Sequence, residues 1–88
     1  MNIYSNRLDN VRDRYSSHGI DGIYITNITN VRYITGFTGS AGIAVILKRK
    51  AAIFVDGRYT LQVKSEVDKK VFEIIEISKV SPGAWIAA

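Results

Sequence analysis

Residues 41–56, AGIAVILKRKAAIFVD, hold two apolar runs that are separated by the basic triplet Lys48–Arg49–Lys50. Each run is continuously apolar rather than alternating, which is typical of a strand buried on both faces of a sheet. Because the connection between them is so short, we expect the two strands to be antiparallel neighbours joined by a solvated turn. The rest of the fold is predicted outward from this hairpin.

The segments before the hairpin predict a helix, a short strand and a further short helix. Ser5 is the expected cap of a helix over residues 5–18, and Gly19 is its expected end. The apolar residues 23–25 predict a strand. Residues 27–35 have a weaker pattern, which favours a short helix with one apolar face.

The segments after the hairpin repeat this alternation. Apolar residues recur every four positions and predict a helix over about 58–68, and residues 72–77 predict a further strand. Ser81 and Pro82 have the pattern of a helix start, with only six residues after them. The fold class expected from all of these elements is a single α/β domain with three layers, in which helices flank a mixed β-sheet.

The composition limits the classes of protein that need to be considered. The 88 residues include no cysteine, so disulfides and thiolate zinc sites are excluded. No apolar run reaches the roughly 18 residues of a membrane span, and the N-terminus lacks a secretory signal, so we expect a cytoplasmic protein with no membrane partner. The net charge of +4 would suit nucleic acid, but the basic residues are scattered, and we expect no nucleic-acid partner.

The loop TGFTGSAG, residues 35–42, has a glycine at every third position. A phosphate-binding P-loop needs lysine and serine or threonine after its last glycine, whereas Ile43 and Ala44 follow here. The dinucleotide fingerprint has a different glycine spacing and leads into a helix, whereas this loop leads into a predicted strand. We interpret the loop as a close approach of backbone that presents Phe37 at the end of the sheet.

No catalytic or metal-binding set emerges from the residues. His18 is the only histidine and is predicted to be exposed in the last turn of the first helix. Several carboxylates follow the hairpin without a spacing that suits a metal or an acid–base pair: Asp56, Glu66, Asp68, Glu73 and Glu76. We expect Asp56 to cap a turn or helix, and we expect the chain taken alone to be non-catalytic.

Two polar clusters are predicted to converge at one end of the sheet. One precedes the glycine loop and the other follows the second buried strand, so a hairpin would bring them together. The candidate recognition residues in this neighbourhood are Arg32, Tyr33, Phe37, Arg58 and Tyr59. Arginine and tyrosine are common at the centres of binding surfaces, which favours a recognition site here.

The blocks NVRYITGFTGSAGIAVI, residues 30–46, and AAIFVDGRYTLQV, residues 51–63, resemble the N-terminal domain of the creatinase, prolidase and aminopeptidase P family. They are most similar to the aminopeptidase P branch, the Xaa-Pro aminopeptidases. The resemblance implies a ribonuclease-H-like α/β domain and a parent metallopeptidase that releases an N-terminal residue preceding proline. Its site, usually two Mn²⁺ ions, would lie in a C-terminal pita-bread domain that residues 1–88 do not include.

The resemblance also implies what this domain does. In the family it helps to form dimers or larger assemblies and restricts the active-site entrance to short peptides. By matching position, Arg32, Tyr33, Phe37 and Arg58 would lie at that entrance or interface. Trp85 resembles the tryptophan that opens the next family helix, so we expect residues 1–88 to be an incomplete form of the domain. A stand-alone interaction module of the same fold is the alternative.

Overall fold

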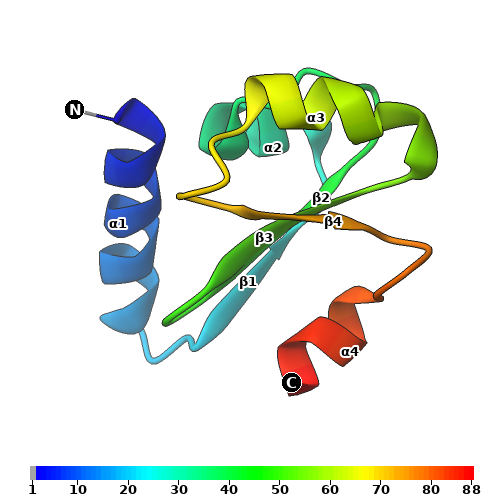
Figure 1. Cartoon of the computed structure of the whole chain (residues 1–88). Helices are drawn as coiled ribbons and strands as arrows, with labels where there is room; N and C mark the ends of the chain where they lie inside the picture. Colours follow the sequence, from blue (N-terminus) through cyan, green and yellow to red (C-terminus); the bar gives the residue numbers. More distant parts are fainter. Residues whose placement is uncertain (1) are drawn as a thin grey trace.

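The computed structural model describes residues 2–88 and has a mixed four-stranded sheet between two helical layers (Figure 1). The elements in chain order are α1 Ile3–Ser16, β1 Gly22–Ile25, α2 Ile28–Thr35, β2 Ile43–Leu47, β3 Ala51–Val55, the 3₁₀ turn η1 Gly57–Tyr59, α3 Thr60–Glu66, β4 Glu73–Glu76 and α4 Pro82–Ala87. The sheet order is β1-β2-β3-β4. The three-layer α/β prediction is therefore confirmed.

The central hairpin forms as its sequence predicts. Strands β2 and β3 are antiparallel, with Val45 opposite Ala52, and the Leu47 amide donates to the Lys50 carbonyl at 2.8 Å across the turn. All five residues of β3 are buried, as are the central three of β2. Strand β1 pairs antiparallel with β2, and β4 pairs parallel with β3, so the sheet is mixed.

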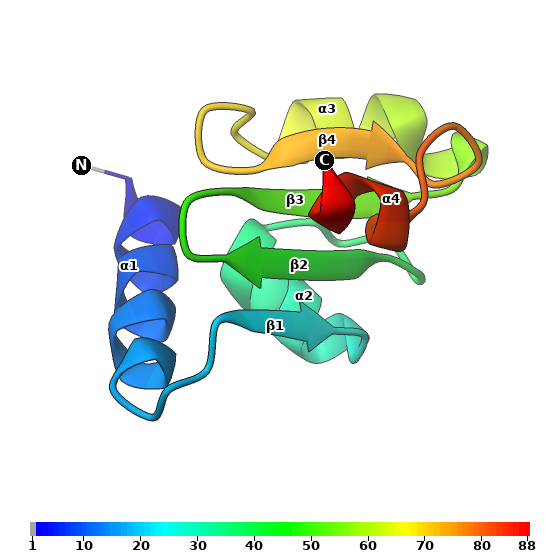
Figure 2. The ribbon, with the colours of Figure 1, turned by 90° about the horizontal axis from the view of Figure 1, so that it is seen from below.

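Helices α1, α2 and α3 cover one face of the sheet, and α4 covers part of the other (Figures 1 and 2). The larger core lies under the three helices and includes Leu8, Val31, Ile53, Val63 and Phe72. Burial of this apolar surface is the main stabilising contribution to the domain. The same packing fixes α2 and α3, which flank the candidate site.

The smaller core on the opposite face is built around Trp85 of α4. Its ring packs edge-on against Phe54 at 5.7 Å between centroids, and its indole nitrogen donates to the Glu73 carboxylate at 3.1 Å. Lys50 lies over the same ring, 4.3 Å from its centroid, and donates to the Trp85 carbonyl at 2.7 Å. This cation–π contact anchors α4 to the hairpin turn.

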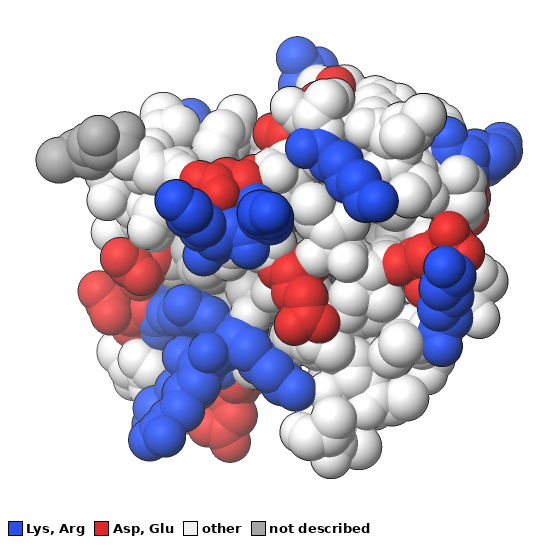
Figure 3. All heavy atoms as spheres, in the orientation of Figure 1, with Lys and Arg blue, Asp and Glu red and all other residues white. Residues whose placement is uncertain are grey.

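The basic turn is thus only partly solvated, contrary to the prediction. Lys48 and Arg49 are exposed, whereas Lys50 is half-buried against α4. Figure 3 shows Lys and Arg side chains gathered at the lower left, over the end of the molecule where this turn lies. No helix within residues 2–88 is both long and apolar enough to cross a membrane.

Helix α1 is capped by Asn2, three residues before Ser5, so the predicted cap is wrong. The Asn2 side chain accepts hydrogen bonds from the amides of Tyr4 and Ser5, at 2.9 and 3.3 Å, and Ser5 lies inside the helix. Asparagine caps helices as well as serine does, and Asn2 precedes Ser5 in the chain. The chain leaves α1 through Gly19 at φ +73°, as its position suggested.

The other elements lie close to their predicted positions. The uncertain stretch 27–35 is a helix, capped by the Asn27 side chain, which accepts from the Thr29 amide at 2.9 Å. The helix predicted over 58–68 begins as the turn η1 and ends at Glu66. Ser81 caps α4, accepting from the Ala84 amide at 3.1 Å.

Phe37 explains the glycine spacing, although not in the way the sequence suggested. Its side chain is 0% exposed, so the loop buries this residue in the core rather than presenting it on the surface. Gly36 ends α2 in the left-handed conformation at φ +86°. A Cβ at Gly39 would lie 2.1 Å from Cζ of Phe37, and one at Gly42 would lie 3.1 Å from its Cε2. The glycines therefore let the backbone pass directly over the ring.

We expect Gly39→Ala to destabilise the domain, because the added methyl would overlap the buried ring of Phe37. Overpacking of this kind costs about 1–3 kcal/mol in the free energy of unfolding. Gly83→Ala is the matched control, because nothing lies within 4 Å of its Cβ position in α4. It should be neutral or slightly stabilising, since alanine favours helix. Urea denaturation of both variants checks this, and equal effects would contradict the proposed role of the ring.

Candidate functional site

The glycine loop is held at its start by the hydroxyl of Thr35, which is buried at the end of α2. This hydroxyl donates to the Val31 carbonyl at 2.7 Å and accepts from the Phe37 amide at 3.1 Å. The second bond gives a hydrogen-bond partner to the buried amide of Phe37, just beyond the end of α2. The direction in which the chain enters the loop is therefore fixed by α2.

The middle of the loop is held by the carboxylate of Glu66 on α3. One oxygen accepts from the Thr38 amide at 2.8 Å, and the other accepts from the Thr38 hydroxyl at 2.6 Å. Gln62 donates to the Thr38 hydroxyl at 3.1 Å from the same helix. These bonds to Thr38 lower the pKa of Glu66 from its ordinary value. We call Thr38, Gln62 and Glu66 the loop latch.

The DGRY segment forms a second fixed element beside the loop. Asp56 caps η1 by accepting from the Arg58 amide at 2.9 Å, as predicted for a turn or helix cap. Its two oxygens also accept from Nε and Nη2 of Arg58, at 3.1 and 3.0 Å. These hydrogen bonds lower the pKa of Asp56 and raise that of Arg58. The Arg58 side chain is held in place while 75% of its surface stays exposed.

Tyr59 joins the two elements. Its ring packs edge-on against Phe37 at 5.5 Å between centroids, and its hydroxyl forms a hydrogen bond with the hydroxyl of Ser40. The guanidinium of Arg58 lies 5.2 Å from the centre of the Tyr59 ring. Of the five candidate recognition residues, the structure therefore brings Phe37, Arg58 and Tyr59 together.

Arg32 lies beside the glycine loop, where it lines a hollow of about 280 Å³ with Thr38 and Ser40. Its charge contributes to the low pKa of Glu66. Arg32 is exposed, and no salt bridge to it occurs within residues 2–88. Two arginines therefore lie near the glycine loop: Arg32 at this hollow, and Arg58 beside Tyr59, which contacts the loop.

Tyr33 does not join this group. Its ring lies 4.0 Å from the guanidinium carbon of Arg7, which is also stacked on Tyr4 at 5.3 Å. Arg7 further donates to the Tyr33 carbonyl at 2.8 Å. Tyr33 therefore belongs to the contact between α1 and α2, because adjacent residues on a helix point in different directions.

Sequence reasoning missed the loop latch and the exposure of Leu61. Leu61 is 84% exposed on α3, three residues after Arg58, and no spacing argument singles it out. For the latch a clue existed, because Gln62 lies in the block AAIFVDGRYTLQV, residues 51–63, which carries the family resemblance. The partner of Gln62 lies in a loop 24 residues earlier in the chain, so the contact itself required the structure.

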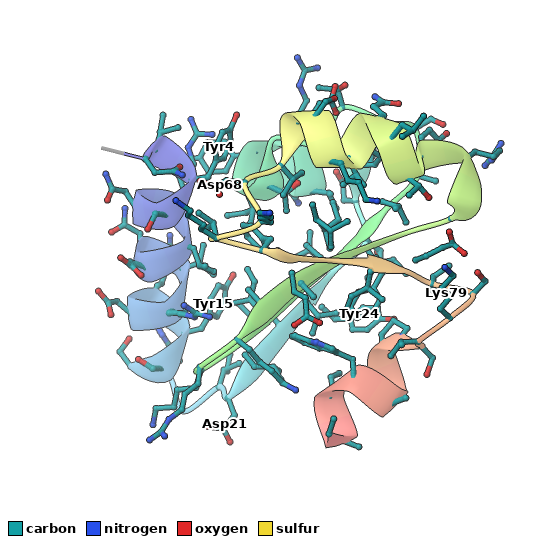
Figure 4. The ribbon with its side chains drawn as sticks, viewed as in Figure 1. Tyr4, Tyr15, Asp21, Tyr24, Asp68 and Lys79 are labelled. Atoms are coloured by element: carbon teal, nitrogen blue, oxygen red, sulfur yellow. The ribbon has the colours of Figure 1, made fainter. Side chains whose placement is uncertain are left out.

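The remaining residues considered as catalytic or metal-binding candidates lie apart from one another. His18 follows the end of α1 rather than lying in its last turn, and its Nδ1 lies 2.8 Å from the Arg14 carbonyl. Within residues 2–88, no three His, Asp or Glu side chains are grouped so that they could hold a metal ion. Asp68 accepts from the Asn2 side chain at 2.8 Å, which ties the loop before β4 to α1 (Figure 4).

We expect Glu66→Gln to weaken the latch and to change how stability depends on pH. The folded-state pKa of Glu66 lies below its ordinary value of 4.5. The contribution of Glu66 to the free energy of unfolding is therefore present above pH 4.5, and it is lost as the pH falls through the pKa of Glu66 in the folded state. At pH 7 the variant should lose about 0.5–1 kcal/mol in the free energy of unfolding, because the bonds to Thr38 are exposed to solvent, and this loss should shrink below pH 4.5. Urea denaturation from pH 7 to pH 3 measures this.

Asp9→Asn, at an exposed position on α1, is the control. A difference in the free energy of unfolding between the parent chain and Glu66→Gln that does not change with pH would contradict the role of the latch.

Two curated relatives align with the greater part of this chain. It is 57% identical over 70 residues, 80% of its length, to the uncharacterized peptidase YqhT of Bacillus subtilis, of which it covers 19%. It is 46% identical over 56 residues, 64% of its length, to Xaa-Pro aminopeptidase 2 of Rattus norvegicus, of which it covers 8%. The chain therefore spans a fifth or less of the length of these relatives.

Solved structures share the fold. The N-terminal, creatinase/prolidase-like domain of a metallopeptidase from Corynebacterium diphtheriae has a TM-score of 0.78 and 30% identity, covering 85% of this chain and 60% of that one. The N-terminal domain of the cytoplasmic peptidase PepQ from Mycobacterium tuberculosis has a TM-score of 0.71 and 29% identity, covering 86% and 56%. Both descriptions place the matching fold at the N-terminus of a peptidase.

The family model that matches covers residues 7–88, which include every strand and both blocks that carry the resemblance. The sequence blocks, the three-layer fold and the relatives agree. This chain belongs to the creatinase/prolidase N-terminal domain family.

Proposed function

We propose that this chain is a non-catalytic N-terminal domain of a cytoplasmic Xaa-Pro aminopeptidase, which restricts substrate access and takes part in assembly. One observation carries the proposal. The two sequence blocks typical of the family meet in a single fixed surface, where Arg58 is held by Asp56 and left 75% exposed. A charged side chain with few free rotamers loses little entropy on binding, which suits a recognition surface.

The roles within this surface differ. Arg32 and Arg58 lie near the glycine loop and would contact peptide or the catalytic domain at the active-site entrance. Phe37 and Tyr59 would act indirectly, by fixing the loop between them. Tyr33 is 56% exposed beside α1, on a different part of the surface, and would contact a second copy in a dimer.

The chemistry would be supplied by a separate catalytic domain that holds two metal ions, expected to be Mn²⁺. The metal pair would activate a water molecule for attack on the peptide bond before proline. The carboxylates of this chain serve other purposes, since Asp56 caps η1 and Glu66 holds the loop. The substrates would be peptides with proline at the second position.

The alternative is a stand-alone interaction module of the same fold. It is favoured by the exposed pair Arg58 and Leu61, which would form a binding surface with or without a catalytic domain. The two proposals differ in whether this surface affects peptidase turnover.

We expect the isolated 88-residue chain not to cleave an Xaa-Pro peptide, even with Mn²⁺ supplied. The reason is that the residues described hold no group of ligands for the metal pair. Release of the N-terminal amino acid, measured by mass spectrometry on a tripeptide with proline second, checks this. Turnover that survives a contaminant control would refute the non-catalytic assignment.

We also expect Arg58→Ala to impair a peptidase that carries this domain. A suitable host is the Bacillus relative, with the 70 aligned residues replaced by those of this chain. Loss of an exposed, preorganised arginine should lower kcat/KM for an Xaa-Pro peptide on the order of tenfold. Lys64→Ala on α3 is the matched control. If neither kinetics nor assembly changes, the module alternative is favoured and the entrance role of Arg58 is excluded.

A further inference from the structure

The two edges of the sheet differ in how well they are protected. Strand β4 carries Glu73 and Glu76 at its ends, and both carboxylates accept hydrogen bonds, from Trp85 at 3.1 Å and from Ser78 at 2.7 Å. Strand β1, Gly22–Ile25, has no charged residue, and its one partner strand among residues 2–88 is β2. Charged residues discourage strand addition at an edge, so in the described part of the chain β1 is the less protected edge.

A groove lies beside this edge, between β1 and the C-terminal half of α1, with a volume of about 530 Å³. Its apolar lining includes Ile20, Ile23, Ile46 and Tyr15. Figure 4 shows Tyr15 between α1 and the sheet, on the groove side of the helix. Ile20 is 43% exposed and Tyr15 38%, so this lining is accessible to a partner.

The groove is far from the candidate site described above. It is lined by Ile46 and Leu47 at the end of β2, whereas the glycine loop precedes Ile43 at the beginning of the same strand. Figure 2 shows β1 at the outer edge of the sheet, with α1 crossing at one end of the strands. An occupant of the groove would therefore leave the Arg58 surface free.

The rim of the groove carries an excess of negative charge. Three carboxylates line it, Asp9, Asp13 and Asp21, against the two basic residues Arg12 and Lys48. Arg12 keeps its positive charge, and its Nε donates to the Leu47 carbonyl at 2.9 Å, which holds the side chain at the groove. Three carboxylates against Arg12 and Lys48 give the lining a net charge of −1, in a chain whose net charge is +4.

We propose that β1 and this groove bind an extended segment of a partner protein by strand addition. The backbone of the segment pairs with the free edge of β1, and one apolar side chain enters the groove. Residues two positions before and after that side chain lie on the same face of a strand, so lysine or arginine at those positions would meet the carboxylates of the rim. The motif expected in the partner is, in sequence order, basic-x-apolar-x-basic, where x is any residue. This inference does not depend on the peptidase assignment.

The other face of β1 fits the same mode of binding. Tyr24 is 53% exposed and lies on the side of the sheet that α4 only partly covers (Figure 4). Its neighbour across the sheet is Val45, so an added strand would place a side chain against the ring of Tyr24 from the open side. Aromatic residues paired across strands stabilise a sheet, which adds to the backbone pairing.

The probe is an acetylated and amidated peptide with the sequence Thr-Lys-Thr-Leu-Thr-Lys-Thr, titrated into the ¹⁵N-labelled chain. We expect amide shifts in β1 and in the residues that line the groove, with little change in the glycine loop. A peptide with glutamate in place of both lysines should bind at least tenfold more weakly. One with proline in place of the two inner threonines should not bind, because proline cannot pair as a regular strand.

Two variants test the site itself. Ile20→Asp should weaken the lysine peptide at least tenfold, and Ile86→Asp on α4 is the matched control, because both isoleucines are 43% exposed. Asp13→Lys, at an exposed position on α1, should reverse the preference between the lysine and glutamate peptides without altering the apolar lining. Circular dichroism confirms that each variant is folded.

Three outcomes would overturn the proposal. The first is the absence of shifts in β1 at millimolar lysine peptide. The second is equal binding by the Ile20→Asp and Ile86→Asp variants. The third is a dimer, seen by analytical ultracentrifugation, that Ile20→Asp abolishes, because a second copy and not a peptide segment would then occupy the edge.

Discussion

The packing of Gly39 and Gly42 over the ring of Phe37 is the constraint on which the candidate site depends. A side chain at Gly39 would overlap the ring, and the ring itself is enclosed by Tyr59 on its other side. The path of the backbone from α2 into β2 is therefore determined by the core and not by the solvent-facing residues of the loop. A loop held in this way can place Ser40 without ordering it at the moment of binding.

Hydrogen bonds to two carboxylates extend this rigidity to the surface. Glu66 ties the loop to α3 through Thr38, and Asp56 holds both the turn η1 and the guanidinium of Arg58. Both groups have a lowered pKa, because the hydrogen bonds favour their charged forms. Exposed ion pairs contribute little to stability on their own, so the Asp56–Arg58 pair is better explained by the orientation it gives the arginine.

The fold was predictable because its signals are local. Continuous apolar runs define β2 and β3, and capping residues define the ends of α2 and α4. Prediction from the sequence failed where two residues could each cap the same helix, or where contacts between residues far apart in the chain determine the position of a side chain. Asn2 and Ser5 are both good caps, and only tertiary position selects Asn2. Phe37 belongs to a loop that looks exposed, yet its burial depends on glycines on one side and on Tyr59 on the other. Tyr33 is diverted to α1 by Arg7, which lies 26 residues away in the chain.

The two ends of the sheet are built in different ways, and the difference has a physical origin. At the glycine loop, the side chains of the loop latch are hydrogen-bonded to one another, so the surface is preformed. At β1, one backbone edge has no partner strand within residues 2–88, and the neighbouring groove is lined by partly exposed apolar side chains. A preformed polar surface favours a partner with a complementary fixed shape, whereas an open strand edge favours a segment that becomes ordered as it binds. A domain with both can hold a folded neighbour at one end and an extended chain at the other, because neither contact uses the residues of the other.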